Sequence, residues 1–350
     1  MPKLTFVPPM EAKSVADLPE DEGWQFEPKW DGFRCVACKQ AGQVDLWAKS
    51  GKPLGRYFPE MVELVEALPG DTVMLDGELI VPIDGVASFD ALQARLHPAA
   101  SRVKKLAGET PALLVVFDLL HLDGESWLDR PLRARRAALE RYVKDVGSDR
   151  LRVSPITADA EQARHWLEGL STELDGVIAK RSDDPYARGE RAMRKIKRIR
   201  SADCVVGGFR YGTDSDQVGS LLLGLYDEQG KLDHVGFTSA IAAKDKPDLT
   251  RRLEALKGGP GFTGKAPGGP SRWSTERSAE WVPLRPELVV EVLYDQVTSR
   301  RFRHGTRLHR WRPDKAPSQC TFDQMAQPAA PDQVIGAVLT KAVGRRQKTH

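Results

Sequence analysis

EPKWDGFR, residues 27–34, is the stretch that decides how the rest of the sequence is interpreted, because it sets a lysine, an aspartate and an arginine around one glycine. In an extended chain successive side chains point to opposite faces, so Lys29 and Asp31 would lie on one face. Trp30 and Phe33 are then free to pack elsewhere. The simple alternative is an exposed Asp-Gly turn, which needs no function. The remainder of the chain has to decide between these interpretations.

The composition is that of an ordinary globular protein. Its 350 residues are 41% hydrophobic and 29% charged, and this length favours two domains or one large domain. The net charge of +3 is small, but the cations form two runs that each contain a single acid. Such runs are usually solvated surface, yet two of them in one chain indicate a polyanionic partner. The first run comprises Arg188, Arg191, Arg194, Lys195, Lys197, Arg198 and Arg200, and the second comprises Arg300, Arg301, Arg303, Arg307, Arg310, Arg312 and Lys315.

The four cysteines do not suggest a disulfide framework. Cys35 and Cys38 form a CxxC motif, but Cys204 and Cys320 stand alone and supply no second pair for a zinc site. We therefore expect four reduced thiols. No apolar stretch approaches the length of a membrane span, and the first ten residues lack the apolar region of a signal peptide, so we expect a cytoplasmic protein.

Hydrophobic periodicity predicts mixed α and β structure over the first 200 residues. Residues 56–68 carry apolar side chains at helical spacing, residues 72–81 alternate like a strand, and residues 111–120 form the continuous apolar run of a buried strand. Residues 175–181 predict another short strand. Because there is no regular βαβ rhythm, the fold class expected is α+β, with mixed or antiparallel sheets rather than a doubly wound sheet.

The hydrophobic pattern of the sequence changes after Ser201. Short β-rich segments separated by Gly, Asp and Ser turns predict a small β-barrel over residues 201–326, with a helical turn at residues 251–256. A tail at residues 327–350 follows, in which residues 332–346 are apolar on one helical face and predict a short helix. The expected domains are thus residues 1–200, residues 201–326 and this tail.

One segment imitates a phosphate-binding loop. GPGFTGKA, residues 259–266, matches GxxxxGK, but a P-loop also needs a preceding strand, a Ser or Thr after the lysine and a helix start. Ala266 and Pro267 follow the lysine instead. We therefore interpret this segment as a surface loop.

Chemically useful side chains recur on the predicted strands. Alternation places Asp76 and Glu78 on one face of their strand and Leu75, Leu79 and Val81 on the other. Each such residue alone has a structural explanation, since an aromatic residue in an apolar run is more often core than a base platform. Together they fit nucleotidyl transfer, in which lysines neutralise phosphate, carboxylates hold hydrated Mg²⁺ and an aromatic ring stacks on the base. The set consists of Lys29, Asp76, Glu78, Phe117, Asp175, Lys195 and Lys197.

The order of these motifs resembles that of the covalent nucleotidyltransferases. KWDGFR resembles motif I, KxDGxR, whereas LDGEL, VFDLL, LDGVIAKR and KIK resemble motifs III, IIIa, IV and V. RWRPDK, residues 310–315, resembles motif VI, RxDK, of the ATP-dependent DNA ligases. The resemblance covers about residues 7–326 and is greatest to the small bacterial ligases of the LigC type. It implies a nucleotidyltransferase domain, ATP-grasp-like with antiparallel sheets and helices, followed by an OB-fold β-barrel.

The resemblance implies ATP-dependent DNA ligation in three steps. Lys29 would attack the α-phosphorus of ATP, AMP would then pass to the 5′-phosphate at a DNA nick, and the 3′-hydroxyl would seal the backbone. A protonated lysine is a poor nucleophile, so burial and the nearby Lys195, Lys197 and Arg34 are expected to favour the neutral amine. The implied cofactors are ATP with Mg²⁺ or Mn²⁺. The implied partners are nicked duplex DNA and DNA-repair proteins, with a monomeric enzyme at the nucleoid.

The resemblance also implies individual roles. Phe117 would stack on adenine and Glu27 would contact it, while Arg34 and Glu78 would approach the ribose and the metal. Lys49, Lys195 and Lys197 would contact phosphate, Glu78 and Asp175 would bind the metal, and Asp31 would take part in catalysis. Arg312, Asp314 and Lys315 would orient the pyrophosphate. These last three residues belong to the second domain, and the hinge between the domains is expected just after Lys197.

Three positions depart from the family pattern. Asp175 stands where a glutamate is usual, and Met193 stands where a tryptophan is common. Lys49 replaces the arginine of a Ser-Arg-x-Gly motif, and lysine cannot copy a bidentate guanidinium grip on phosphate. Three rival functions therefore stay open: an RNA ligase, an mRNA-capping guanylyltransferase relative, or a non-catalytic OB protein that binds nucleic acid. For a DNA ligase we expect nick recognition to come from the two basic runs and the barrel face, mainly through contacts with phosphates.

Overall fold

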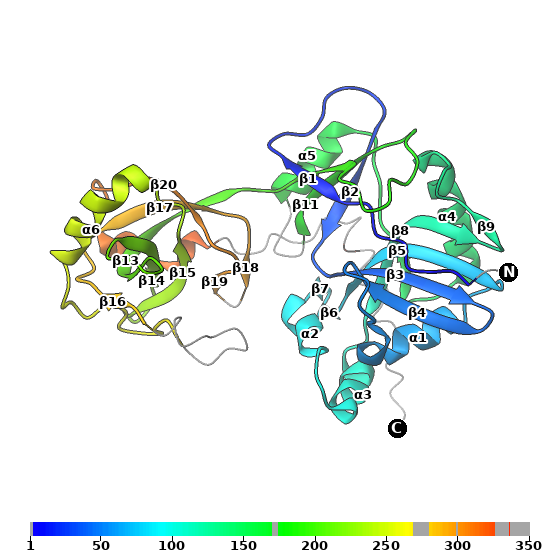
Figure 1. Cartoon of the computed structure of the whole chain (residues 1–350), viewed down its shortest axis with the longest axis horizontal. Helices are drawn as coiled ribbons and strands as arrows, with labels where there is room; N and C mark the ends of the chain where they lie inside the picture. Colours follow the sequence, from blue (N-terminus) through cyan, green and yellow to red (C-terminus); the bar gives the residue numbers. More distant parts are fainter. Residues whose placement is uncertain (1–2, 170–173, 269–279, 299, 326–335, 337–350) are drawn as a thin grey trace. The chain divides into compact units, whose positions relative to one another are not determined.

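The computed structural model describes residues 3–169, 174–268, 280–298, 300–325 and 336 (Figure 1). The described chain divides into two compact units, of which the first runs to Lys197 and the second begins at Arg198. Each unit has its own hydrophobic core. None of the helices in the described ranges is long and apolar enough to cross a membrane.

The first unit is built on a six-stranded sheet. Its neighbours are antiparallel except for one parallel pair at the edge. The two strands predicted from apolar patterning lie at its centre, which confirms the expected α+β architecture. The strand order is β10 (Leu151–Val153), β8 (Leu113–Leu122), β5 (Thr72–Ile80), β3 (Phe33–Gln40) and β4 (Gln43–Ala48), with β9 (Glu125–Ser126) paired to β8.

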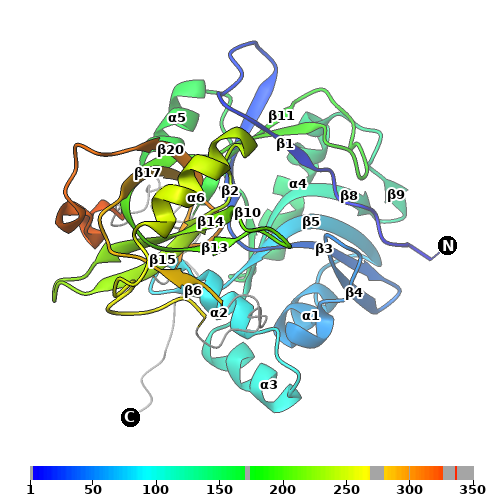
Figure 2. The same ribbon diagram turned by 60° about the vertical axis from the view of Figure 1, so that its left-hand side comes forward.

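A second sheet of four strands joins the first at the opening motif. Its order is β1 (Ala12–Val15), β12 (Met193–Ile196), β11 (Leu174–Arg181) and β2 (Trp24–Trp30). The chain leaves β2 after Trp30 and enters β3 of the first sheet at Phe33 (Figures 1 and 2). Lys29, one residue before the end of β2, therefore lies where the two sheets meet. Gly32 is required at this crossing, since a Cβ there would lie 2.2 Å from the carbonyl oxygen of Leu79.

Helices cover one face of the main sheet and leave the other face to the second sheet. Helix α1 (Pro59–Glu66) and helix α4 (Leu132–Val146) share a core with Leu75 and Leu79 of β5. Asp76 and Glu78 therefore point to the opposite face, as alternation predicts. The remaining helices of this unit are α2 (Phe89–Ala94), α3 (Ala100–Glu109) and α5 (Ala160–Gly169).

The helix predicted over residues 56–68 is shorter than expected. A 3₁₀ turn occupies Gly55–Tyr57, and α1 itself begins at Pro59. Proline favours the first helical position because its ring fixes φ and it has no amide hydrogen to leave unpaired. The apolar spacing thus located the buried face of this helix, while the proline sets its start.

The second unit is an antiparallel barrel-like sheet. Its two edges approach each other where Thr238 forms a bridge with Thr306, the residue before the last strand. The strand order is β15 (Leu232–Thr238), β14 (Val218–Tyr226), β13 (Arg200–Tyr211), β17 (Val289–Tyr294) and β20 (Arg307–Trp311), with β16 (Val282–Pro283) on β13 and a separate pair of β18 (Val297–Thr298) and β19 (Arg301–Phe302). The predicted helical turn at residues 251–256 overlaps the last part of α6 (Lys246–Glu254).

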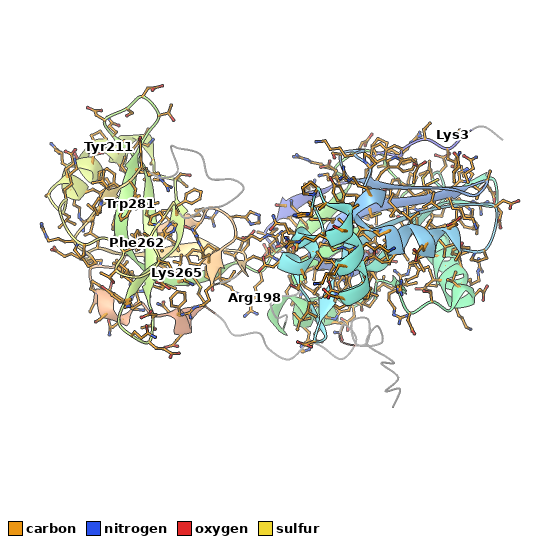
Figure 3. The ribbon with its side chains drawn as sticks, turned by 90° about the horizontal axis from the view of Figure 1, so that it is seen from below. Lys3, Arg198, Tyr211, Phe262, Lys265 and Trp281 are labelled. Carbon is orange, nitrogen blue, oxygen red and sulfur yellow. The ribbon has the colours of Figure 1, made fainter. Side chains whose placement is uncertain are left out.

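The barrel core reaches the loop that imitates a P-loop. Phe262 packs against Trp281 with ring centroids 5.4 Å apart, and Lys265 lies farther along the same unit (Figure 3). The amide of Lys265 donates to Asp233 Oδ1, and no helix begins in residues 259–266, all of which the structure describes. The prediction of a loop is confirmed.

The cysteine prediction is confirmed as well, because all four thiols are free and buried. Burial raises the pKa of Cys38 to about 12, so the CxxC pair is not a reactive site. The helix predicted at residues 332–346 lies, except for Gly336, outside the described residues.

Candidate active site

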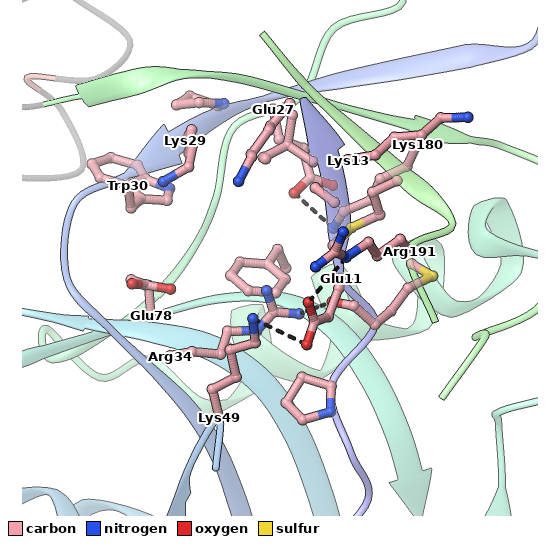
Figure 4. Close-up of a pocket in the computed structure, with 18 of the residues that line it drawn as sticks. Glu11, Lys13, Glu27, Lys29, Trp30, Arg34, Lys49, Glu78, Lys180 and Arg191 are labelled. Carbon is pink, nitrogen blue, oxygen red and sulfur yellow. Dashed lines mark hydrogen bonds and ion pairs between the residues drawn. The ribbon is translucent and has the colours of Figure 1, made fainter. Parts of the chain in front are cut away.

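A pocket of 630 Å³ opens in the first unit where its two sheets meet (Figure 4). The segment Pro9–Ser14, strand β2 and residues of β11 and β12 form its walls. Asp175 and Lys197 are not among the lining residues, but Asp175 forms an ion pair with Lys29 and a second ion pair with Lys197. The predicted site residues that line the pocket are Glu27, Lys29, Arg34, Lys49, Glu78, Phe117 and Lys195.

The Lys29 amine lies against a buried carboxylate. Lys29 Nζ is 2.6 Å from Asp175 Oδ2, and Lys197 Nζ is 3.0 Å from Asp175 Oδ1. Asp175 is only 8% exposed, and its Oδ1 has no partner with hydrogen-bond geometry among the described residues. One carboxylate therefore holds the candidate nucleophile and a second lysine together.

Gly176 allows Asp175 to take this position. Its φ of +128° is rarely adopted by other residues, and it lies at an irregularity in the pairing of β11 with β2. A Cβ at Gly176 would lie 2.0 Å from the carbonyl oxygen of Ile196. The glycine of the predicted Asp-Gly motif thus allows the backbone of β11 to pack closely against β12.

Positive charge is concentrated beside the amine. Lys195 projects from β12 and lines the pocket, and burial, followed by the charges of Lys197 and Lys29, lowers its pKa. Three lysines and one carboxylate leave a net positive site. A polyphosphate is the kind of ligand that would balance it.

Arg34 is fixed by a buried network. Its Nε donates to Asp76 Oδ1 at 2.6 Å and its Nη2 donates to Asp76 Oδ2 at 2.5 Å. The Tyr186 hydroxyl donates to the same Asp76 Oδ2 at 2.6 Å and accepts from the amide of Met10 at 3.0 Å. Asp76 is fully buried, so these donors satisfy a charge that could not otherwise remain there. Tyr186 was not predicted, because no local pattern links it to Asp76.

A second buried network surrounds the predicted base platform. Glu27 Oε2 is 2.9 Å from Lys180 Nζ, and Gln25 Nε2 donates to Glu27 Oε1 at 2.8 Å. Lys180 Nζ also lies 4.5 Å from the centroid of the Phe117 ring, and Arg34 Cζ lies at the same distance. Lys180 was missed as a site residue, although it is the lysine of the LDGVIAKR motif.

Glu78 differs from the other acids of the pocket. Burial raises its pKa to about 7, although the nearby Arg34 and Lys29 act against this change. The charges of Asp76 and Asp31 raise it further, which places Asp31, just after β2, within electrostatic reach of Glu78. Glu78 lines the pocket, whereas the predicted catalytic residue Asp31 does not.

Lys49 lies at the mouth of the pocket. Its Nζ is 3.0 Å from Glu11 Oε1, and Arg191 Nε is 3.9 Å from Glu11 Oε2 (Figure 4). The hydrogen bond from Lys49 lowers the pKa of Glu11. Glu11 and Arg191 were not predicted, since they come together only through the parallel pairing of β1 with β12.

The predicted motif VI residues lie in the second unit, just after β20. Arg312 Nη1 donates to Asp203 Oδ1 at 2.9 Å, and Lys315 Nζ donates to Asp203 Oδ2 at 2.7 Å. Arg312 Nε donates to Asp314 Oδ1 at 2.9 Å, and this hydrogen bond lowers the pKa of Asp314 to about 2. Asp203 was missed, although a lone acid in the apolar run ADCVV could have marked it.

An amine at a strand end, a cluster of lysines, buried carboxylates and an aromatic ring around one pocket are typical of an enzyme that transfers nucleotidyl groups. Comparison with known proteins defines the family. Residues 9–197 match the ATP dependent DNA ligase domain, and residues 214–315 match the ATP dependent DNA ligase C terminal region. The chain belongs to the ATP-dependent DNA ligase family, as its motif order predicted.

Relatives of similar length support this assignment. The chain is 44% identical over 336 residues to DNA ligase C1 of Mycolicibacterium smegmatis, covering 92% of this chain and 94% of that protein. It is 41% identical over 345 residues to DNA ligase C of Mycobacterium tuberculosis, covering 94% and 96%. These relatives confirm the predicted likeness to LigC-type ligases. A solved Lig E DNA ligase structure has the same fold, with a TM-score of 0.54 at 15% identity, covering 88% of this chain and 100% of that chain.

Proposed function

We propose that this protein seals nicks in duplex DNA, using ATP to form an adenylate on Lys29. The observation that carries the proposal is the contact with Asp175 made by Nζ of Lys29, a residue that lines the 630 Å³ pocket. Lys29 is the pocket lysine whose amine is held directly against a buried acid beside Lys195 and Lys197. The matched family supplies the reaction class, and the pocket supplies its chemistry in this chain.

The first step forms a bond between Lys29 Nζ and the α-phosphorus of ATP. The bond from that phosphorus to the bridging oxygen breaks, and the electron pair leaves with pyrophosphate. Nζ must lose a proton before it attacks, and Asp175 Oδ2 is positioned to hold that proton at 2.6 Å. Lys195 and Lys197 would offset the charge that develops on the phosphate oxygens.

The base would occupy the side of the pocket formed by Phe117 and Glu27. Phe117 would stack on the base, and the carboxyl group of Glu27 would accept a hydrogen bond from an exocyclic amine. Arg34, held by Asp76, would contact the ribose side. Lys49 would contact phosphate at the pocket mouth, where a ligand would compete with Glu11.

Glu78 and Asp175 are the residues that would hold Mg²⁺ or Mn²⁺. They fit such an ion, because Asp175 Oδ1 is buried with no partner in hydrogen-bond geometry in the described ranges beyond the ion pair with Lys197, and Glu78 is a half-buried carboxyl group that lines the pocket. No set of three or more His, Cys, Asp or Glu side chains in those ranges could enclose a metal. Mg²⁺ commonly binds through one or two carboxylates and substrate phosphates. When bound, the ion neutralises phosphate charge.

The adenylyl group then passes to DNA. The 5′-phosphate oxygen at the nick attacks the phosphorus, the P–N bond breaks, and Lys29 recovers its amine. The 3′-hydroxyl next attacks the activated 5′-phosphorus, a phosphodiester bond forms and AMP leaves. We assign the DNA contacts to the two basic runs, because such contacts go mainly to phosphates.

We assign the remaining roles by the same reasoning. Residues 1–200 would act as the adenylation domain and residues 201–326 as an OB-fold domain, with a hinge after Lys197. Arg312, Asp314 and Lys315 would orient the pyrophosphate leaving group. The protein would work as a monomer in DNA repair, in the cytoplasm at the nucleoid.

Labelling with ATP that carries ³²P at the α-phosphate tests the proposal. In the presence of Mg²⁺ we expect covalent label on the wild-type protein and none on Lys29→Ala or Lys29→Arg. Lys39→Ala is a matched control, because Lys39 lies on the neighbouring strand β3 and its amine donates to the carbonyl of Leu68. Label retained by Lys29→Ala would move the nucleophile elsewhere, and labelling by GTP or sealing confined to RNA would overturn the substrate assignment.

A further inference from the structure

The cations of motif VI converge on one buried acid in the second unit. Asp203 lies in β13, and its side chain is 11% exposed. Arg312 Nη1 lies 2.9 Å from Asp203 Oδ1 and 3.1 Å from Oδ2, so this one guanidinium nitrogen bridges both carboxylate oxygens. Lys315 Nζ adds a third contact at 2.7 Å from Oδ2. A single acid therefore sets the position of both cations.

Asp203 is itself held firmly. Its amide donates to Gln324 Oε1 at 2.9 Å, and Gln324 Nε2 donates to the carbonyl oxygen of Asp203 at 3.1 Å. The ladder between β13 and β17 places it opposite Glu291. The strand pairing and the two hydrogen bonds with the Gln324 side chain therefore hold the backbone of Asp203 in a fixed position.

Asp314, the second acid that binds Arg312, is exposed to solvent. Arg312 Nε donates to Asp314 Oδ1 at 2.9 Å and Nη2 donates to Asp314 Oδ2 at 2.8 Å. The Asp314 side chain is 63% exposed, whereas Asp203 is buried. Two parallel N–H donors on one guanidinium edge can bind a phosphate as readily as a carboxylate. The Nε and Nη2 edge is therefore the exchangeable one.

We propose that Asp203 is a positioning residue for the adenylation step. It holds the inner edge of Arg312 and the ammonium group of Lys315, so that the outer edge of Arg312 exchanges Asp314 for an oxygen of the pyrophosphate leaving group. This inference rests on the proposed function, in which Arg312 and Lys315 orient pyrophosphate. It adds the residue that fixes their geometry.

The chain offers a matched control. Glu291 faces Asp203 across β13 and β17, its side chain is 13% exposed, and it accepts a hydrogen bond from Arg310 Nε at 2.6 Å. Its separation from Arg312 is 3.9 Å, longer than a hydrogen bond. Glu291→Gln removes the same charge from the same sheet and leaves the contacts of Asp203 intact.

The test measures single steps of the reaction in the full-length protein. We expect Asp203→Asn to lower the maximal rate of lysyl-adenylate formation about tenfold or more, because misplaced groups lose the advantage of fixed orientation. Asp203→Glu should recover part of that rate, and Glu291→Gln should leave it unchanged. Sealing of a nick that already carries a 5′-adenylate releases no pyrophosphate, so its rate should be the same in every variant.

Four other results would contradict the inference or the proposed function. Equal losses in Asp203→Asn and Glu291→Gln would show a general charge effect and overturn the inference. A loss in sealing of the adenylated nick would show a structural role and also overturn it. If the wild-type protein and Asp203→Asn form the lysyl-adenylate at the same rate, this inference is refuted and the proposed function stands. If the wild-type protein forms no adenylate at all, the proposed function itself is refuted.

Discussion

Acidification should destabilise the second unit through one buried histidine. His234 lies in β15 with 5% of its surface exposed, and Arg301 Nη2 lies 2.9 Å from its Nδ1. Because arginine can only donate, Nδ1 must accept and the ring must be neutral. Burial, followed by the charges of Arg301 and Arg210, lowers the pKa of His234 to about 3.

The direction and size of the effect follow from linkage. Histidine in an unfolded chain has a pKa of about 6.5, so the unfolded protein binds the proton more tightly than the folded protein does. The neutral His234 ring contributes its full stability to the folded protein above about pH 6.5, the pKa of the unfolded state. This contribution is lost as the pH falls from there toward the folded-state pKa of about 3. With these two pKa values, the free energy of unfolding at pH 5 should be about 2 kcal/mol lower than at pH 7.5.

Urea unfolding at both pH values, with amide hydrogen exchange in β14 and β15, measures this change in the full-length protein. The comparison is between wild type and His234→Gln, which should lose most of the pH dependence. His304→Gln is the control, because His304 is 55% exposed and contacts Asp295 at 3.4 Å, so its replacement should leave the dependence unchanged. If His234→Gln loses as much stability as wild type between pH 7.5 and pH 5, His234 is not the titrating group and the reasoning fails.

Two further predictions concern the pocket and the DNA surface. Glu27→Ala would leave Lys180 buried without its acid, so urea unfolding should show a loss of about 3 to 5 kcal/mol in the first unit. The double variant Glu27→Leu with Lys180→Met should regain much of that stability, and a double variant as unstable as Glu27→Ala would contradict the pairing. Binding to nicked duplex should weaken steeply with rising KCl, and replacing the exposed Arg188 and Arg307 by glutamine should reduce the logarithmic slope by about one for each residue that contacts a phosphate. A flat salt dependence would count against the basic runs as the DNA surface.

Patterns within single strands and motifs predicted much of this molecule. The alternation over residues 72–81 separated the helix-covered face of β5 from the face that carries Asp76 and Glu78, because side-chain direction in a strand is a local property. Partners distant in sequence left no such pattern. Glu11 meets Arg191 because β1 pairs in parallel with β12, about 180 residues later in the chain, and it also meets Lys49, which follows β4.

Asp203 illustrates a second limit of sequence reasoning. Its place in an apolar strand was visible, and a buried acid needs cationic partners. The sequence alone could not say that those partners follow β20, because the order of β13, β17 and β20 in the sheet decides it. Motif VI therefore marked Arg312 and Lys315 as candidates, but not the acid that holds them.

The pairing of these cations has a consequence for catalysis. The pairs are Lys29 and Lys197 with Asp175, Arg34 with Asp76, Lys49 with Glu11, and Arg312 and Lys315 with Asp203. In the proposed function, nucleotide binding would exchange carboxylates of the protein for phosphates at the exposed pairs, so its free energy would be a difference between two sets of ion pairs. A polyanion that cannot make this exchange gains little. At Lys29 the exchange would also separate the amine from Asp175, which in the proposed mechanism takes up the proton of Nζ before the attack.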